Sequence, residues 1–206
     1  MGRPLNMQPE PFAYPPTPHI RRHGPRGYAQ YESYREWLRD EFSFRCVFCL
    51  YREQWPGSQS FQIDHLLPRA QYPEKECDYV NLVYVCPRCN GIKLAKRVPD
   101  PCRIALGKSL QVHPDGRIRA LNLHGRLLLK ALRLDNDAHT QTRRLLVGIL
   151  ETCFRHNRPQ FVLLMGYPKN LVDLGRLDPP HGNTRPAGVR DSAYARRQRG
   201  DLPEVY

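Results

Sequence analysis

Four of the seven cysteines form two pairs in which two residues separate the members. The pairs are Cys46/Cys49 and Cys86/Cys89. Two intervening residues allow both thiolates of a pair to reach one ion, and two pairs complete a tetrahedral Zn²⁺ site. Because four sulfur ligands leave no open position, we expect this zinc to be structural. Two redox-active motifs are the alternative, but these are expected beside a strand–helix–strand pattern that we do not find here.

Residues suited to phosphodiester hydrolysis lie between these pairs and just after them. The reaction needs an activated water, neutralisation of the phosphate charge and help for the departing oxygen. A neutral imidazole such as His65 can accept the proton of the attacking water near pH 7. Asp64 and Asn90 offer hard oxygen ligands suited to Mg²⁺ or Mn²⁺. Each has an ordinary interpretation on its own, such as a surface hydrogen bond or a helix cap. Together they lie between the two cysteine pairs and directly after the second one, and this order favours the catalytic interpretation.

Three motifs in order carry a family resemblance. Asp64-His65-Leu66-Leu67-Pro68, then Asn81-Leu82, then the run from Cys86 to Lys93 resemble the HNH endonuclease family, over roughly residues 42–97. The resemblance implies a ββα-metal (His-Me finger) core, a catalytic divalent ion, and products with 5′-phosphate and 3′-hydroxyl ends. In similar nucleases the residue at the position of Asn81 steadies the loop that holds the general base.

Two further residues are expected to bind the substrate, and two positions depart from the family pattern. Lys93 lies one turn after Asn90, where it is expected to contact a phosphate, and Arg69 is assigned to the substrate as well. Many relatives carry two glycines shortly after the Asp-His motif, where this chain has Arg69-Ala70-Gln71. The last position of the pattern is Asn90 and not histidine.

Apolar patterning predicts the elements that must position these side chains. A helix is expected from Ser33, which has capping-box spacing to Glu36. Strands are expected at 61–63 and 82–85, with a helix beginning at Pro87. Adjacent side chains on a strand point to opposite sides, so a turn must bring Asp64 and His65 toward the same phosphate. The apolar face of the first helix is interpreted as core: Tyr34, Trp37, Leu38 and Phe42.

The chain divides into four segments, which together predict an α+β fold. Residues 1–27 form a proline-rich N-terminal arm, expected to be extended or disordered. Residues 28–100 contain the HNH core with its zinc knuckle. A hairpin and two helices, near 125–134 and 137–156, are expected to pack on the core within 101–156. Residues 157–206 form a basic tail that contains proline and glycine.

The net charge indicates which class of partner the protein binds. The formal net charge is +12, which favours a polyanion such as nucleic acid as the partner. The alternative is a cationic protein that is merely soluble. For the nuclease that the resemblance implies, DNA is expected as the substrate in preference to RNA. Arginines of the arm and tail are expected to hold phosphates, or else, in the tail, to form a solvated, disordered face.

The absence of a long apolar run predicts no membrane segment, and a cytoplasmic location follows from the absence of a signal. Two alternatives to an enzyme remain. One is a zinc-knuckle nucleic-acid-binding protein without catalysis, and the other is a subunit that docks a protein partner through its arm or tail.

Overall fold

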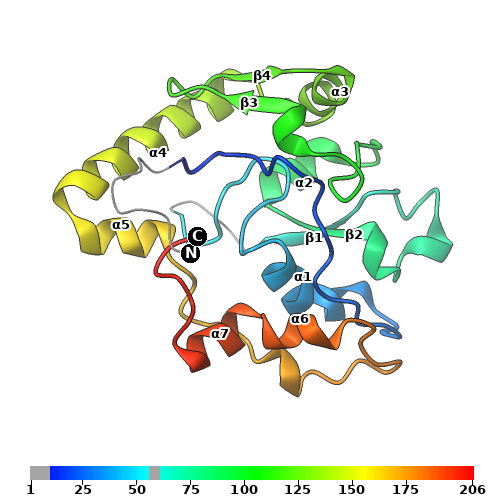
Figure 1. The fold of residues 1–206 in the computed structure, drawn as a ribbon. Coiled ribbons are helices and arrows are strands. Elements are labelled where there is room, and N and C mark those ends of the chain that lie inside the picture. Colours follow the sequence, from blue (N-terminus) through cyan, green and yellow to red (C-terminus); the bar gives the residue numbers. More distant parts are fainter. Residues whose placement is uncertain (1–9, 56–60) are drawn as a thin grey trace.

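A two-stranded antiparallel sheet followed by a short helix lies at the centre of the fold. The computed structural model describes residues 10–55 and 61–206. Strand β1 (Gln62–His65) pairs with β2 (Leu82–Val85), so that Gln62 lies opposite Val85 and His65 opposite Leu82. Helix α2 (Pro87–Lys93) follows β2 after a single residue (Figure 1). The predicted order of strand, loop, strand and helix is confirmed. Two short 3-10 turns, η2 (Pro73–Lys75) and η3 (Tyr79–Asn81), shape the loop between the strands.

The helix before the sheet buries its apolar face but begins differently from the prediction. A 3-10 turn, η1 (Tyr31–Tyr34), leads directly into α1 (Arg35–Glu41). The predicted capping box at Ser33 is wrong, because neither turn nor helix has a side-chain cap and Glu36 instead pairs with Arg39 at 3.1 Å. The predicted core face is confirmed, since all four of its residues are buried: Tyr34, Trp37, Leu38 and Phe42.

A hairpin and two helices follow the sheet, and the first of these helices packs against α2. A 3-10 turn, η4 (Leu106–Lys108), precedes β3 (Leu110–Val112), which pairs antiparallel with β4 (Ile118–Ala120). Helix α3 (Leu123–Leu132) begins two residues before the predicted start, because the Asn122 side chain accepts a hydrogen bond from the N–H of Gly125. Helix α4 (Asp137–His156) has the predicted bounds, with Asn136 as its cap.

The tail folds into further helices. These are α5 (Arg158–Met165), the 3-10 turn η5 (Leu174–Arg176), α6 (Pro186–Arg190) and α7 (Ala193–Arg199). Helices α6 and α7 lie on the α1 side of the molecule, opposite the hairpin and α3 (Figure 1). The alternative of a solvated, disordered face at 185–199 is wrong as to disorder, because most of this segment lies in α6 and α7, although most of its arginines are exposed. Arg197 donates to the carbonyls of Pro168 and Lys169.

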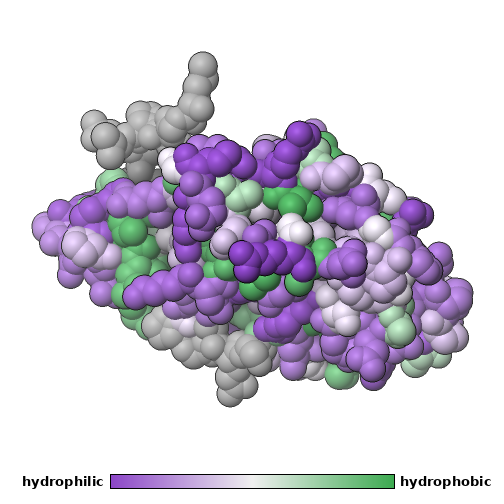
Figure 2. Space-filling model, turned by 90° about the horizontal axis from the view of Figure 1, so that it is seen from below, coloured by the Kyte–Doolittle hydropathy of each residue, from purple (hydrophilic) through white to green (hydrophobic). Residues whose placement is uncertain are grey.

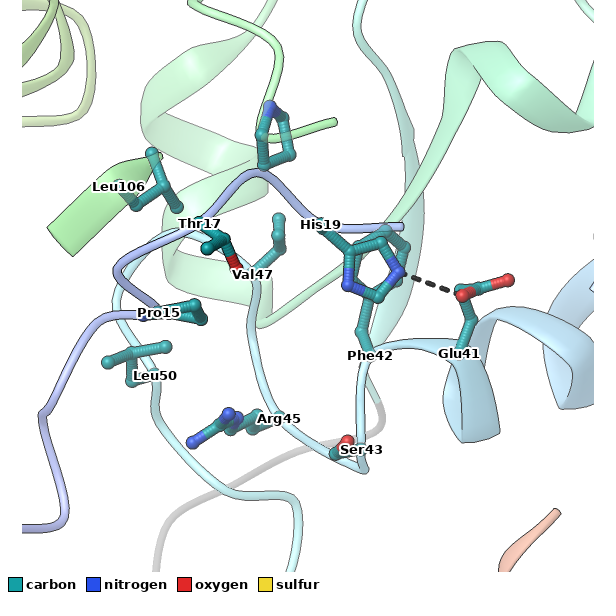
Figure 3. A pocket seen from close by; sticks show the side chains of 11 residues that line it. Pro15, Thr17, His19, Glu41, Phe42, Ser43, Arg45, Val47, Leu50 and Leu106 are labelled. Carbon is teal, nitrogen blue, oxygen red and sulfur yellow. Dashed lines mark hydrogen bonds and ion pairs between the residues drawn. The ribbon is translucent and has the colours of Figure 1, made fainter. Parts of the chain in front are cut away.

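The described part of the arm, residues 10–27, is extended and held against α1. The Nε2 of His23 lies 2.8 Å from Asp40 Oδ2, and the Nε2 of His19 lies 2.8 Å from Glu41 Oε1. Figure 3 shows His19 pointing toward Glu41 beside a small cavity of about 70 Å³. Arg21 is buried and donates to the Leu82 carbonyl at 2.7 Å, so it points inward and not toward a phosphate. Residues 1–9 of the arm lie outside the described residues.

The buried residues form two apolar clusters. The larger surrounds α1, β1 and β2, and the smaller joins Trp55 to α4 and α5 through Leu150 and Phe161. On the face shown in Figure 2, hydrophilic residues cover most of the surface and apolar residues gather in separate patches. Among the helices that the structure describes, none has the length and apolar character needed to cross a bilayer.

Candidate functional site

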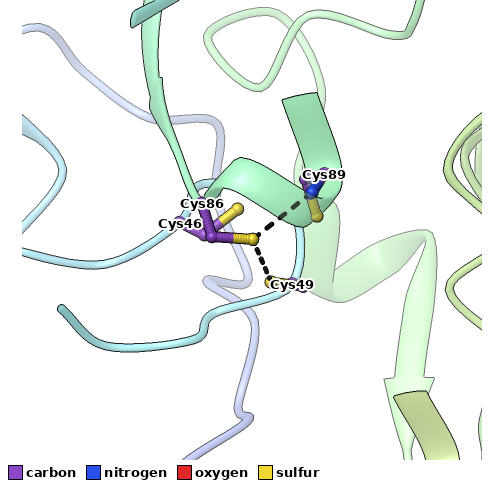
Figure 4. A group of neighbouring side chains, drawn as sticks. All are labelled: Cys46, Cys49, Cys86 and Cys89. Atoms are coloured by element: carbon purple, nitrogen blue, oxygen red, sulfur yellow. Dashed lines mark hydrogen bonds between the residues drawn. The ribbon is translucent and has the colours of Figure 1, made fainter. Parts of the chain in front are cut away.

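The four paired cysteines converge at one buried point. Their sulfur atoms all lie within 4.8 Å of one another, as expected for ligands of a single ion (Figure 4). Cys46 and Cys49 lie in a tight turn after α1, closed by a hydrogen bond from the Leu50 N–H to the Cys46 carbonyl. Cys86 caps α2, and its sulfur accepts from the N–H of Cys89 at 3.4 Å. The predicted cysteine cluster is therefore confirmed as a group that could hold a metal ion.

The electrostatics of this cluster suit a cation. Hydrogen bonds from the neighbouring thiols lower the pKa of Cys86, and the same sulfur contacts raise the pKa of Cys49 and of Cys89. One thiolate therefore makes ionisation of the next one harder, because the charges lie close together in a buried space. A divalent cation removes this conflict by stabilising all of the thiolates at once.

Asp64 lies in β1 with its carboxylate buried and only partly satisfied. Its Oδ1 accepts from the His65 N–H at 2.8 Å and from the Lys93 ammonium at 3.1 Å. Its Oδ2 is buried and has no hydrogen-bond partner among the described residues. Burial raises the pKa of Asp64, while the Lys93 charge acts in the opposite direction. A buried oxygen without a partner is costly, so Oδ2 is suited to an additional cation.

Lys93 is turned inward, toward the strand. Its side chain is 0% exposed, and its ammonium donates to the His65 carbonyl at 2.7 Å as well as to Asp64. The expected contact with a phosphate would require the ammonium to leave this ion pair. Lys93 therefore fixes the end of β1 in this structure. Nothing in the sequence around Lys93 indicates this role.

His65 ends β1 with one ring nitrogen bonded and the other available. Its Nε2 lies 3.0 Å from the Glu76 carbonyl, and the Tyr31 ring packs edge-on against it. Because a carbonyl only accepts, Nε2 carries the proton and Nδ1 is left as the acceptor. Burial lowers the pKa of His65 below its ordinary value of 6.5, although the Glu76 hydrogen bond acts in the opposite direction.

Asn81 ties down the loop that follows His65. Its Oδ1 accepts from the Leu67 N–H at 2.8 Å, and its Nδ2 donates to the carbonyls of Leu67 and Lys75, both at 3.1 Å. Its own carbonyl accepts from the Leu66 N–H at 2.9 Å. All three functional groups of this buried residue thus hold the backbone beside the imidazole.

One cleft of about 310 Å³ collects most of the predicted residues. Asp64, His65, Arg69 and Asn90 line it together, whereas Asn81 and Lys93 lie behind its wall. The Asn90 amide donates to Gln62 at 2.7 Å, which leaves its oxygen available. Arg69 is exposed and pairs loosely with Glu76 at 3.3 Å. Sequence reasoning missed Tyr31, Gln62 and Glu76, because their roles depend on contacts that no local motif encodes.

Two antiparallel strands and a helix that bring Asp64, His65 and Asn90 into one cleft define the ββα-metal class of site. Residues 46–96 match the model of the HNH endonuclease family, so this part of the chain is similar to an HNH domain. The matched segment contains all four cysteines and every predicted site residue. Helix α1 and the elements from β3 onward lie outside it. A search of curated proteins finds none that matches the chain.

Proposed function

We propose that this protein is a metal-dependent endonuclease that hydrolyses phosphodiester bonds, with DNA as its substrate. The observation that carries the proposal is the state of His65. Its Nε2 is committed to the Glu76 carbonyl, and its Nδ1 is the free acceptor in a cleft shared with Asp64 and Asn90. A positioned imidazole of lowered pKa is a general base that stays neutral at physiological pH.

The residues of the cleft fit a divalent ion. Asp64 Oδ2 is buried without a hydrogen-bond partner in the described residues, and the Asn90 amide nitrogen is bonded so that its oxygen is available. Both are oxygen donors of the kind that Mg²⁺ or Mn²⁺ prefers. When bound, such an ion would neutralise charge on the phosphate and stabilise the departing oxygen. Only two protein ligands predict weak binding in the absence of substrate.

The remaining steps belong to the chain itself. His65 takes the proton of the attacking water at Nδ1 as the new bond to phosphorus forms. The bond between phosphorus and the 3′ oxygen breaks, and the departing oxygen takes a proton from solvent water, which leaves 5′-phosphate and 3′-hydroxyl ends. Asn81 holds the loop beside the imidazole through its three side-chain hydrogen bonds. Arg69, exposed at the cleft, contacts a substrate phosphate. Lys93 would reach a phosphate only after release from Asp64.

We propose that the ion in the cysteine cluster is structural Zn²⁺. Four sulfur donors favour zinc over Mg²⁺, and a closed set of ligands leaves no position for water or substrate. With zinc bound, the four cysteines would hold the turn after α1 to the start of α2, and Cys89 would thereby help to fix Asn90, the next residue. A cytoplasmic location would keep these cysteines reduced and able to bind metal.

Cleavage of supercoiled plasmid tests the proposal directly. Purified protein is incubated with Mg²⁺, Mn²⁺ or EDTA, beside His65→Ala and a control variant, His124→Ala, which removes an exposed histidine of α3. We expect metal-dependent nicking or linearisation that His65→Ala loses and His124→Ala keeps. RNA is assayed in parallel. Folded, zinc-loaded wild-type protein that binds nucleic acid but cuts neither substrate with any metal would support the non-catalytic binding protein instead.

A further inference from the structure

Leu94 ends helix α2 in an unusual way. Its side chain is 69% exposed. Its backbone has φ 49° and ψ −132°, a combination that glycine adopts readily and leucine does not. The Leu94 N–H still donates to the Asn90 carbonyl at 3.1 Å, so the last turn of the helix holds this conformation in place. An apolar side chain is thus projected into solvent at a cost to the backbone.

The position of Leu94 is the second observation. It lines the same cleft as Asp64, His65 and Asn90, and lies one helical turn after Asn90. An isolated exposed leucine normally needs no explanation. Leu145, for example, is 64% exposed in the regular backbone of α4. Leu94 differs because its backbone is strained and because it borders the residues expected to act on a phosphate.

Cationic residues share the cleft with Leu94 or follow it in the sequence. Arg69 lies on the same cleft, and Lys96 and Arg97 follow just after it, all three of them exposed. The Lys96 ammonium is fixed at the ends of α2 and α3 by the carbonyls of Ile92 and Ala131, and Arg97 stacks over Tyr72 at 5.3 Å. Cations of this kind bind phosphates, whereas an apolar side chain can only contact the sugars or bases between them.

We propose that Leu94 is a substrate-positioning residue that packs against the bases beside the scissile phosphate and partly unstacks them. Apolar wedges of this type open a base step and bend the duplex. A wedge one turn from Asn90 would fix the position of the phosphate relative to His65. The proposal rests on the proposed nuclease function and adds the way in which the substrate is held.

Two substitutions at Leu94 separate the effect of its side chain on the substrate from the effect of its strained backbone on stability. Leu94→Ala removes the side chain and keeps the unfavourable backbone, whereas Leu94→Gly removes both. We expect both variants to lose about 10- to 100-fold in kcat/KM, the equivalent of one buried leucine side chain. Leu94→Gly should nevertheless melt at a higher temperature than wild type, so its loss cannot be ascribed to misfolding. Leu145→Ala is the matched control, and should leave kcat/KM unchanged.

A binding measurement without cleavage completes the test. In the His65→Ala background, a DNA duplex carrying a fluorescent adenine analogue at the mapped cleavage position should brighten on binding, because the analogue unstacks. The increase should vanish with Leu94→Gly or Leu94→Ala and persist with Leu145→Ala.

If wild type cleaves and the Leu94 variants match Leu145→Ala, the wedge is refuted and the nuclease stands. If the wild type never cleaves, the probe is a duplex that carries the analogue at a random position. Brightening that depends on Leu94 would then refute the proposed hydrolysis and leave the wedge standing. No brightening with either duplex overturns the wedge.

Discussion

Replacing Lys93 by methionine should destabilise the fold much more than removing a surface lysine. The side chains of Lys93 and Asp64 are 0% and 8% exposed, and 3.1 Å separates their charged atoms. Methionine fills a similar volume but leaves the carboxylate buried without its cation, and leaves the His65 carbonyl without its donor. Breaking such a pair costs about 3–5 kcal/mol, a large share of the roughly 5–15 kcal/mol that stabilises a typical domain.

The measurement is urea unfolding of zinc-saturated protein, with Lys75→Met as control. Lys75 pairs with Asp78 at 3.3 Å, but their side chains are 45% and 33% exposed, so its loss should cost about 0–1 kcal/mol. The double variant Asp64→Asn with Lys93→Met should recover much of the lost stability, because no unpaired charge remains.

A contact between Lys93 and phosphate predicts a different result. Lys93→Met would then unfold within about 1 kcal/mol of wild type, like the surface control. It would also lower the salt dependence of DNA binding by about one phosphate contact. That pair of results would refute the inward role argued for Lys93.

Three further predictions concern the zinc, the base and the arm. Cys89→Ser should release the zinc, measured by metal analysis, and lower the melting temperature, whereas Cys153→Ser, outside the cluster, should keep the metal. Because burial lowers the pKa of His65, the neutral imidazole persists below pH 6.5. On the acid side, kcat/KM should therefore fall with a midpoint below pH 6.5. A midpoint above that pH would contradict the assignment of His65 as the base. Burial alone would raise the pKa of Glu41, but hydrogen bonds from His19 and an arm N–H lower it from 4.5 to about 2. The ionised carboxylate therefore stabilises the fold above pH 4.5, by about 3 kcal/mol, and this contribution is lost as pH falls toward 2. Glu41→Gln should lower the free energy of unfolding at neutral pH and flatten its dependence across that window in pH-resolved denaturation.

The features predicted correctly from the sequence depend on short-range chemistry. Two residues between cysteines and a proline after Cys86 are sufficient to place a thiolate pair at a helix start. Helix α4 has its predicted bounds, and the side chain that caps it, Asn136, directly precedes its first residue. The positions of Asp64, His65 and Asn90 around one cleft follow from the strand–strand–helix order, which the family motifs also carry.

The features that were missed depend on partners far along the chain. Lys93 and Asp64 are 29 residues apart, and nothing near Lys93 distinguishes a buried lysine from a phosphate ligand. The arm was expected to be extended or disordered because it is rich in proline, but the sequence did not indicate that its histidines lie against the acidic end of α1. Composition gives the charge of a segment, but it does not indicate whether the folded chain places a buried opposite charge beside that segment.

The two carboxylate oxygens of Asp40 also bear on the order in which the protein can be completed. Oδ2 is bonded to His23 of the arm at 2.8 Å, whereas Oδ1 accepts from the Ala193 N–H of the tail at 2.7 Å. A ribosome delivers the arm, α1 and the whole HNH segment long before residue 193. Until then Asp40 Oδ1 lacks this hydrogen bond, and a hydrogen bond to a charged group contributes about 1.5–3 kcal/mol. A nascent or truncated chain would therefore carry a weakened core. Such a chain would unfold more readily than one that includes α7, and would be more open to the cell's proteases.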